Sequence, residues 1–239
     1  MASDTRMILR ALFALLIALA VLPASAKEDV RKPWVVATYA YPERDRLAAI
    51  QPLADYLAKR GRHPVQVKLL PSPTALVQAM REGQVDVAVP NLHGYLQARR
   101  DVPQATPLPV PQVPALQADR YRAVLVARDV ASLAELKAQA GQLRLALVGR
   151  DSASGGFVPA QYLRSQGLDP AKVFASVVHS GSHAAALQAV IEGRADVAAL
   201  AGDVYDASRP DSVHELWRSD PIPPGPLLWL APKSGPDGC

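Results

Sequence analysis

The chain alternates short hydrophobic segments with longer segments in which hydrophobic residues recur every three or four positions. The short segments predict strands and the longer ones predict amphipathic helices. Residues 43–60, for example, place Leu47 and Ile50 on one side of a helix, and we expect Gly61 to end it. This alternation from Pro33 onward is typical of a parallel sheet with crossover helices. We predict strands at residues 34–41, 65–70, 85–89, 121–127, 143–148 and 197–200.

One stretch of sequence recurs 110 residues later: residues 78–88 are QAMREGQVDVA and residues 188–198 are QAVIEGRADVA. Each copy predicts the end of a helix, a glycine C-cap and a strand. The separation is too long for a solenoid repeat, so it favours two similar lobes that use the same helix-to-strand step. A chance similarity between two alanine-rich helices is the alternative.

The N-terminus has the pattern of an export signal. Arg6 and Arg10 precede an apolar run at residues 11–22, and small residues follow at 24–26. We predict a signal peptide of residues 1–26, cleaved after Ala26. A transmembrane anchor is the alternative, but the run is shorter than the roughly 20 apolar residues that span a bilayer.

A second boundary lies at residues 102–116, where five prolines predict an extended connector. We therefore expect an α/β protein with two lobes. The first lobe would comprise residues 27–118 and 208–239, and the second lobe residues 119–207. A proline cluster at residues 221–226 marks the expected return to the first lobe.

Composition narrows the classes of ligand. Loss of residues 1–26 would lower the formal net charge from +4 to +3, which mildly favours anions. No basic stripe interleaved with aromatic residues is present, which disfavours nucleic-acid binding. Cys239 is the only cysteine, so no disulfide is expected. His179 and His183 have no cluster of Cys or Glu near them in sequence, and we expect neither a metal ion nor another cofactor.

The candidate chemistry lies at predicted helix starts. Ser152-Ala153-Ser154-Gly155 follows the strand at 143–148, and its hydroxyl and backbone N–H groups suit an anion at a helix N-terminus. An ordinary serine N-cap with a glycine turn would have the same residues. His183 stands in the first turn of a second helix, where its imidazole can donate to an oxyanion or serve only as a capping residue.

The order of these segments resembles the phosphate/phosphite/phosphonate-binding proteins of ABC transporters. The similar segments are Ser152–Gly155 with Pro159 behind it, Gly181–His183, Asp196–Ala198 and Ser219–Pro223, within a similarity that runs from about Trp34 to Trp229. The resemblance implies a type 2 periplasmic-binding-protein-like fold with a ligand cleft between the lobes. Members of the family continue into further helices after the position of Trp229, so we expect the first lobe to be truncated at its C-terminus.

The resemblance also implies individual roles. Serines of the loop and the histidine would bind phosphonate oxygens, with an alanine in place of the family's middle threonine. Two tyrosines would line the cleft, and an acidic residue would recognise a substrate amine, whereas Gly225 replaces a second acid of aminoalkylphosphonate binders. The implied ligand-binding residues are Ser152, Ala153, Ser154, His183, Tyr121, Tyr95 and Asp203.

We therefore predict a non-catalytic, periplasmic solute-binding protein, expected to be a monomer. It would deliver a phosphonate, phosphate or phosphite to the permease of an ABC transporter. A binding protein that docks on a membrane sensor would use the same cleft. A serine hydrolase is a further alternative, because Ser154, His183 and Asp203 are the residue types of a triad, but the Gly-x-Ser-x-Gly nucleophile motif is absent.

Overall fold

The computed structural model describes residues 32–109 and 120–230, and Pro33–Cys239 form one unit of contacts. The predicted signal peptide and the predicted first crossing near residue 119 lie outside the described residues. None of the helices in the described part combines the length and hydropathy that crossing a membrane requires.

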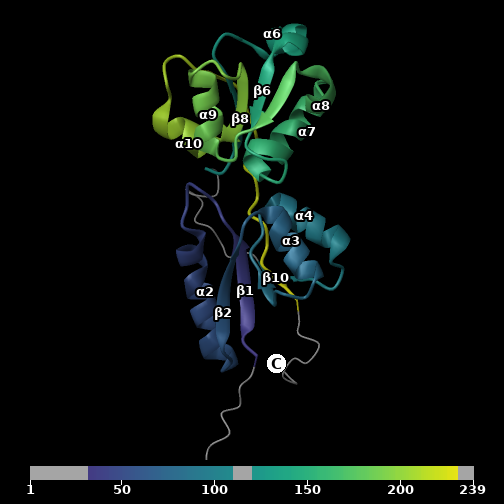
Figure 1. Cartoon of the computed structure of the whole chain (residues 1–239), viewed down its shortest axis with the longest axis vertical. Helices are drawn as coiled ribbons and strands as arrows, with labels where there is room; N and C mark the ends of the chain where they lie inside the picture. Colours follow the sequence, from purple (N-terminus) through teal and green to yellow (C-terminus); the bar gives the residue numbers. More distant parts are fainter. Residues whose placement is uncertain (1–31, 110–119, 231–239) are drawn as a thin grey trace, which may run out of the picture. The chain divides into compact units, whose positions relative to one another are not determined.

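Two five-stranded sheets organise the molecule, and each defines a lobe (Figure 1). The first sheet has the strand order β2-β1-β3-β10-β4. Strand β1 pairs in parallel with β2 and β3, and β10 pairs antiparallel with β3 and β4. The elements of this first lobe are β1 (Trp34–Tyr39), α2 (Arg46–Gly61), β2 (Val65–Leu70), α3 (Pro73–Arg81), β3 (Val87–Ala88), α4 (Leu92–Asp101), β4 (Thr106–Pro107) and β10 (Leu228–Trp229).

The second sheet has the order β7-β6-β8-β5-β9 and repeats this plan. Strand β6 pairs in parallel with β7 and β8, and β5 pairs antiparallel with β8 and β9. The elements of this second lobe are β5 (Ala123–Ala127), α6 (Leu133–Gln139), η1 (Ala140–Gln142), β6 (Arg144–Leu147), η2 (Ala153–Phe157), α7 (Val158–Ser165), α8 (Pro170–Val173), β7 (Ser176–His179), α9 (His183–Ile191), β8 (Val197–Ala201), α10 (Gly202–Ser208) and β9 (His214–Arg218).

Alternate residues of the first sheet face opposite layers of helices. Val36 and Val87 pack with Ile50 and Ala54 of α2, whereas the neighbouring strand residues face α3 and α4. Figure 1 shows α2 on one side of β1 and β2, and α3 with α4 on the other. The period of two in the strands therefore gives each face its own hydrophobic core.

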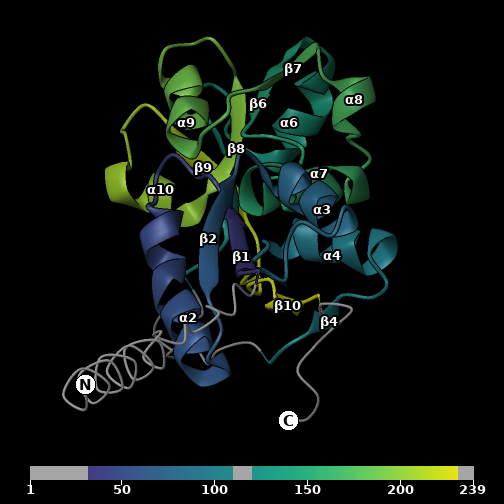
Figure 2. The same cartoon turned by 60° about the horizontal axis from the view of Figure 1, so that its bottom comes forward.

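The second sheet is covered in the same way. Val124 and Val126 face the core that contains α9, whereas Leu125 and Ala127 face the core that contains α6 and α7. Figure 2 shows α9 and α10 on one side of β8, and α6, α7 and α8 on the other. Because both faces are buried, β5 and β8 consist of small and branched apolar residues without a polar alternation.

The sequence repeat proves to be a structural repeat. Residues 71–80 and 181–190 have the same pattern of buried and exposed positions, residue for residue. Gly83 and Gly193, which follow the two helices, have φ angles of 66° and 71°. After each glycine, Asp86 or Asp196 accepts a hydrogen bond from the backbone of the first parallel strand, at 2.7 Å in both lobes. The lobes are thus two versions of one fold.

Helix α2 ends at Gly61, as predicted, but the left-handed cap comes one residue later. Gly61 belongs to the helix, and Arg62 is the left-handed C-cap with a φ of 45°. Gly61 has another role, because a Cβ at this position would lie 2.8 Å from the Trp34 ring. The glycine therefore allows the helix end to approach the start of β1 closely.

The strand pairing also extends the second sheet beyond the predicted boundary at residue 207. Strand β9, at His214–Arg218, pairs with β5 in the second sheet, so the chain returns to the first sheet only after Arg218. In the predicted connector, Thr106–Pro107 forms an edge strand, where proline's missing N–H leaves no neighbour unpaired. The boundary predicted at residue 118 lies outside the described residues and stays a prediction.

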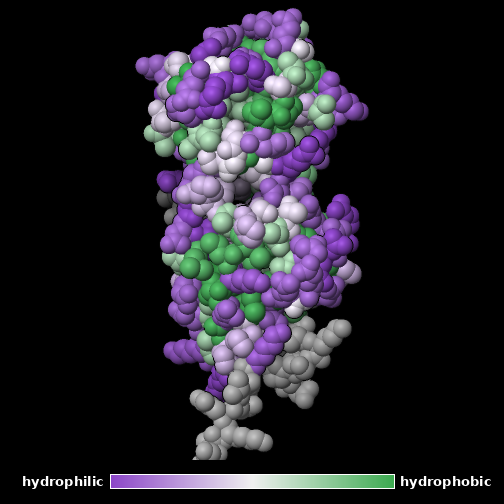
Figure 3. Space-filling model, in the orientation of Figure 1, coloured by the Kyte–Doolittle hydropathy of each residue, from purple (hydrophilic) through white to green (hydrophobic). Residues whose placement is uncertain are grey.

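Hydrophobic side chains remain partly open on the α2 side of the first sheet. Val65, Val67 and Trp229 are only partly buried there, and α2 is the helix that packs on this side. Figure 3 shows hydrophobic residues gathered on the part of the surface where α2 and β2 lie. Leu47 of α2 and Leu69 of β2 are both more than 40% exposed.

Candidate functional site

A cavity of about 420 Å³ lies where the loop after β1 faces the loop after β6. The first lobe contributes aromatic and cationic side chains to its lining, and the second lobe contributes small residues of the loop that begins η2. The lining includes Tyr39, Tyr41, Arg44, Arg46, Asn91, Tyr121, Gly149, Ser152, Ala153 and Gly181. Of the residues expected at the site, Ser152, Ala153 and Tyr121 therefore line one cavity.

Ser154 and His183 lie together next to this cavity, and both are fully buried. A Cβ on Gly155 would lie 2.9 Å from Cε1 of His183, so the η2 turn packs directly on the imidazole and only glycine fits between them. Oγ of Ser154 and Nε2 of His183 have no hydrogen-bond partner among the described residues. Buried polar atoms are nearly always paired, so these two mark a place where a ligand or water is expected.

The protonation of His183 follows from its contacts. Its Nδ1 accepts a hydrogen bond from the Ala201 N–H at 2.9 Å, so in the neutral ring the proton is on Nε2. Burial lowers the pKa of His183 to about 4, an effect that the nearby Glu43 carboxylate opposes. At neutral pH the side chain is therefore an uncharged donor with a free Nε2–H.

Ser152 and Tyr121 border the same space. Ser152 is the N-cap of η2, and its Oγ accepts from the Gly155 N–H at 3.1 Å, which leaves its own hydroxyl proton available. Burial raises the pKa of Tyr121, and the neighbouring Ser154 hydroxyl lowers it in part. The Tyr121 and Ser154 hydroxyls are therefore near each other, although no hydrogen bond of ordinary geometry joins them.

Tyr95 lies outside the cavity. It packs beside the core between the first sheet and α3, and its hydroxyl accepts from Arg99 at 3.2 Å on the surface. The cavity instead has Tyr39 and Tyr41 in its wall.

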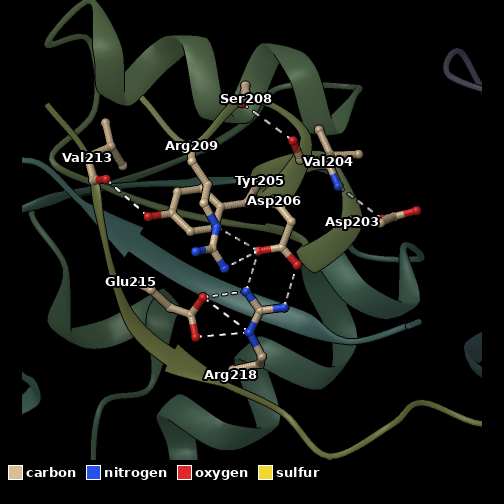
Figure 4. A network of polar contacts seen from close by, with 9 residues as sticks. All are labelled: Asp203, Val204, Tyr205, Asp206, Ser208, Arg209, Val213, Glu215 and Arg218. Carbon is tan, nitrogen blue, oxygen red and sulfur yellow. Dashed lines mark hydrogen bonds and ion pairs between the residues drawn. The ribbon is translucent and has the colours of Figure 1, made fainter. Parts of the chain in front are cut away.

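Asp203 also lies outside the cavity, and lines a separate hollow beside Arg122 and Asp206. Its carboxylate pairs with Arg44 of the first lobe at 2.5 Å. Figure 4 shows Asp203 at the start of α10, beside a network in which Arg218 of β9 binds both Asp206 and Glu215. This network holds α10 against the second sheet. It therefore also positions Asp203, the partner of Arg44 in the second lobe.

Two carboxylates cross between the lobes to helix N-termini. Oε1 of Glu43 accepts from the N–H groups of His183 and Ala184 at the start of α9, at 2.7 and 3.2 Å. In the opposite direction, Oδ2 of Asp151 accepts from the N–H and the hydroxyl of Thr74 at the start of α3, at 3.2 and 3.0 Å. Each repeat helix therefore begins against an acid of the other lobe, which suits the positive end of its dipole.

The charged wall of the cavity escaped the sequence interpretation. Arg46 lies over the Tyr39 ring, 4.1 Å from its centroid, and its guanidinium donates to Thr38 Oγ1 at 2.9 Å. Arg44 lines the same wall. The signal was the charged segment PERDR directly after the first predicted strand, which the periodicity alone places at the start of a helix.

The three triad residue types do not form a triad. In a triad the Nδ1–H of histidine donates to a carboxylate, whereas Nδ1 of His183 is an acceptor for the Ala201 N–H. Asp203 pairs with Arg44 instead. The arrangement suits binding rather than nucleophilic attack.

The sequence matches the family model of the ABC transporter phosphonate periplasmic substrate-binding protein over residues 36–234. The chain belongs to this family. No curated protein matches the sequence. The family is one of substrate-binding components of ABC transporters, which is the type of protein that the sequence predicted.

Solved structures share the fold of this phosphonate-family protein. A binding component of a phosphonate ABC transporter from Pseudomonas aeruginosa has a TM-score of 0.63 and 22% identity, over 85% of this chain and 70% of that one. A Prochlorococcus marinus protein in complex with methylphosphonate has 0.65 and 20%, over 83% and 77%. A Xanthomonas citri protein bound to ATP has 0.66 and 21%, over 85% and 78%. The two-lobed α/β fold is thus that of type 2 periplasmic binding proteins, as predicted.

Proposed function

We propose that this protein binds a phosphonate headgroup beside the cavity and delivers it to the permease of an ABC transporter. The observation that carries the proposal is the pair of buried, unpartnered polar atoms, Oγ of Ser154 and Nε2 of His183. An unpaired buried polar group costs about 1–3 kcal/mol, so a site that keeps two of them is built for a partner that supplies acceptors. A tetrahedral oxyanion supplies several.

The hydrogen-bonding roles follow from the local chemistry. Nε2–H of His183 donates to one oxygen of the headgroup, and the hydroxyls of Ser152 and Ser154 donate to others. Because the first turn of η2 begins in this loop, the positive end of its peptide dipoles also faces the anion. His183 stays neutral, so the cations of the site come from the first lobe.

Arg46 supplies the cation without a carboxylate partner among the described residues, whereas Arg44 shares its charge with Asp203. Both guanidinium groups belong to residues that line the cavity. A guanidinium attracts an oxyanion and speeds its capture. Asp203, which the sequence suggested as the group that recognises an amine, is already neutralised by Arg44.

The size of the cavity favours a phosphonate over phosphate or phosphite. A volume of about 420 Å³ is in the range of small-molecule sites and exceeds what a headgroup alone fills. Tyr39, Tyr41 and Leu69 are in its wall and offer apolar surface to an organic substituent. The methylphosphonate bound to the Prochlorococcus marinus protein supports the same class of ligand.

Export and partners complete the proposal. The family is periplasmic, and the signal peptide at residues 1–26 would bring the protein there. We propose that the two lobes close on the ligand as a monomer, and that the permease recognises the closed form.

Calorimetric titration of the mature protein tests the proposal, with methylphosphonate, 2-aminoethylphosphonate, phosphate and phosphite as ligands. We expect the two phosphonates to bind more tightly than phosphate and phosphite. Ser154→Ala should weaken binding by roughly tenfold, since one hydrogen bond to an anion is lost. Ser165→Ala, on the exposed end of α7, is the matched control and should bind as the wild type does. Absence of binding, or equal binding by Ser154→Ala, would contradict the proposal.

A further inference from the structure

Glu43 has one satisfied and one unsatisfied carboxylate oxygen. Its Oε1 accepts from two N–H groups at the start of α9, whereas its Oε2 is buried and has no partner among the described residues. An ionised carboxylate oxygen only accepts hydrogen bonds, so Oε2 needs a donor. Oγ of Ser154 and Nε2 of His183 are likewise buried without a partner among the described residues, and His183 is one of the two residues whose N–H groups bind Oε1.

The equivalent contact in the other lobe has no such deficit. Oδ2 of Asp151 accepts from Thr74 at the start of α3, and neither oxygen of Asp151 is buried without a partner. A carboxylate can therefore bind a helix N-terminus without leaving its second oxygen buried and unpaired. Of the two contacts, only the one between Glu43 and the start of α9 therefore leaves a buried carboxylate oxygen without a hydrogen-bond donor among the described residues.

The groups that face Glu43 cannot supply the donor. The Glu43 carboxylate acts electrostatically on Tyr41 and His183, whose ring centroids are 5.4 Å from each other. The charged groups beyond them are Arg44 and Asp203, which pair with each other at 2.5 Å, and the remaining titratable groups around Tyr41 are Tyr39 and Tyr121. None of these donates to Oε2, so the donor is a bound ligand or a water molecule, and a ligand in this site is placed to supply it.

We propose that Glu43 is a specificity-determining residue whose Oε2 accepts a hydrogen bond from a P–OH group, so that the site takes monoprotonated phosphonates and rejects sulfonates. The inference rests on the proposed function. Nε2–H of His183 would donate to an unprotonated oxygen of the same headgroup. A sulfonate has the same tetrahedral shape and the same single charge, but it carries no hydroxyl proton at neutral pH. Its oxygen would face Oε2 without a hydrogen between them, and the two negative groups would repel each other.

Methylphosphonate and methanesulfonate are the matched ligands for the test, because they differ chiefly in that proton. Both are titrated calorimetrically into the wild type, Glu43→Gln and Asp151→Asn near pH 6. We expect the wild type to prefer methylphosphonate by at least about 100-fold, as sites built around a hydrogen bond do. The amide introduced by Glu43→Gln can donate to a sulfonate oxygen, so this variant should reduce the preference at least tenfold.

Asp151→Asn separates this effect from general weakening of the contact between the lobes. The variant removes the matching carboxylate at α3, and it should change the affinities for both ligands by a similar factor, so that the preference persists. Thermal unfolding verifies that both variants fold.

Three results would overturn the inference. A wild type that binds methylphosphonate, combined with an unchanged preference in Glu43→Gln, would remove the role of Glu43 and leave the proposed function intact. A wild type that binds 2-aminoethylphosphonate at least tenfold more tightly than methylphosphonate, with the difference lost in Glu43→Gln, would assign Oε2 to an ammonium group. Binding of neither anion would refute the proposed function and the inference with it.

Discussion

The first turns of α3 and α9 share a serine N-cap, a burial pattern and a carboxylate from the opposite lobe, but they differ in the chemistry of the first buried position. Pro73 occupies this position in α3 and His183 occupies it in α9. Proline brings no polar side-chain atom, so the start of α3 is complete once Asp151 is in place. Histidine brings an Nε2–H without a partner, beside a glutamate oxygen without a partner. A single buried side chain can therefore convert a structural repeat into a candidate binding site.

The largest expected difference between the two positions is in pH dependence. Burial lowers the pKa of His183 to about 4 in the folded protein, below its ordinary value of 6.5, so the unfolded chain binds the proton more readily. Stability from this group is complete above pH 6.5 and is lost as the pH falls toward 4. The loss should approach about 3 kcal/mol of unfolding free energy. Urea unfolding at pH 7 and pH 4.5 measures it, and Pro73 contributes nothing of this kind.

The control for this experiment is His183→Gln, in which the contribution should be absent. Burial also lowers the pKa of His93, so both proteins should carry His93→Gln to isolate the effect. The same loss of stability on acidification in both proteins would show that His183 does not cause it.

A smaller difference is expected in ligand affinity. His183→Ala removes the Nε2–H donor, and a hydrogen bond to a charged oxyanion contributes about 1.5–3 kcal/mol, roughly 10- to 150-fold in Kd. Pro73→Ala removes no hydrogen-bonding atom at the equivalent position and should weaken binding much less. Calorimetric titration with methylphosphonate compares the two variants. Equal losses of affinity would show that the start of α9 has no greater role in binding than the start of α3.

The smallest expected effect is on stability and concerns the serine N-cap that both helices have. Ser72 and Ser182 accept from the N–H groups of Ala75 and Ala185, both at 3.1 Å. Ser72→Ala and Ser182→Ala should therefore each lower the unfolding free energy of the ligand-free protein by about 1 kcal/mol. Urea unfolding at pH 7 measures both. A clearly larger loss for one of them would show that the caps are not equivalent.

Much of the fold could be predicted because its strands are buried. Apolar runs located β1, β2, β5, β6 and β8 to within a few residues, and the repeated segment indicated two related lobes. Strand β9, His-Glu-Leu-Trp-Arg, was missed because it is an edge strand with partly exposed charged residues and no continuous apolar run. Strand β10 has two residues, which is too short for any periodicity.

Some residues of the candidate site could likewise be predicted from local sequence and others could not. Ser152, Ser154 and His183 could be singled out because local sequence marks helix starts, and the structure brings them close to one another, while their role in binding stays a prediction. Glu43 and Arg46 could not be assigned, because their roles depend on how a loop of one lobe meets the other lobe. Tyr95 was expected in the cleft, and whether it contributes to binding stays a prediction, since it lies in another part of the first lobe.

The fourth strand of each sheet has a further consequence for how the chain can be divided. Strand β5 enters the second sheet after the chain has left the first, and β10 enters the first sheet after the chain has left the second. A single cut between the lobes would leave the N-terminal fragment without the strand that joins β3 to β4. Two such fragments could therefore complement each other only if β10 of the C-terminal fragment paired again with β3 and β4 of the N-terminal one.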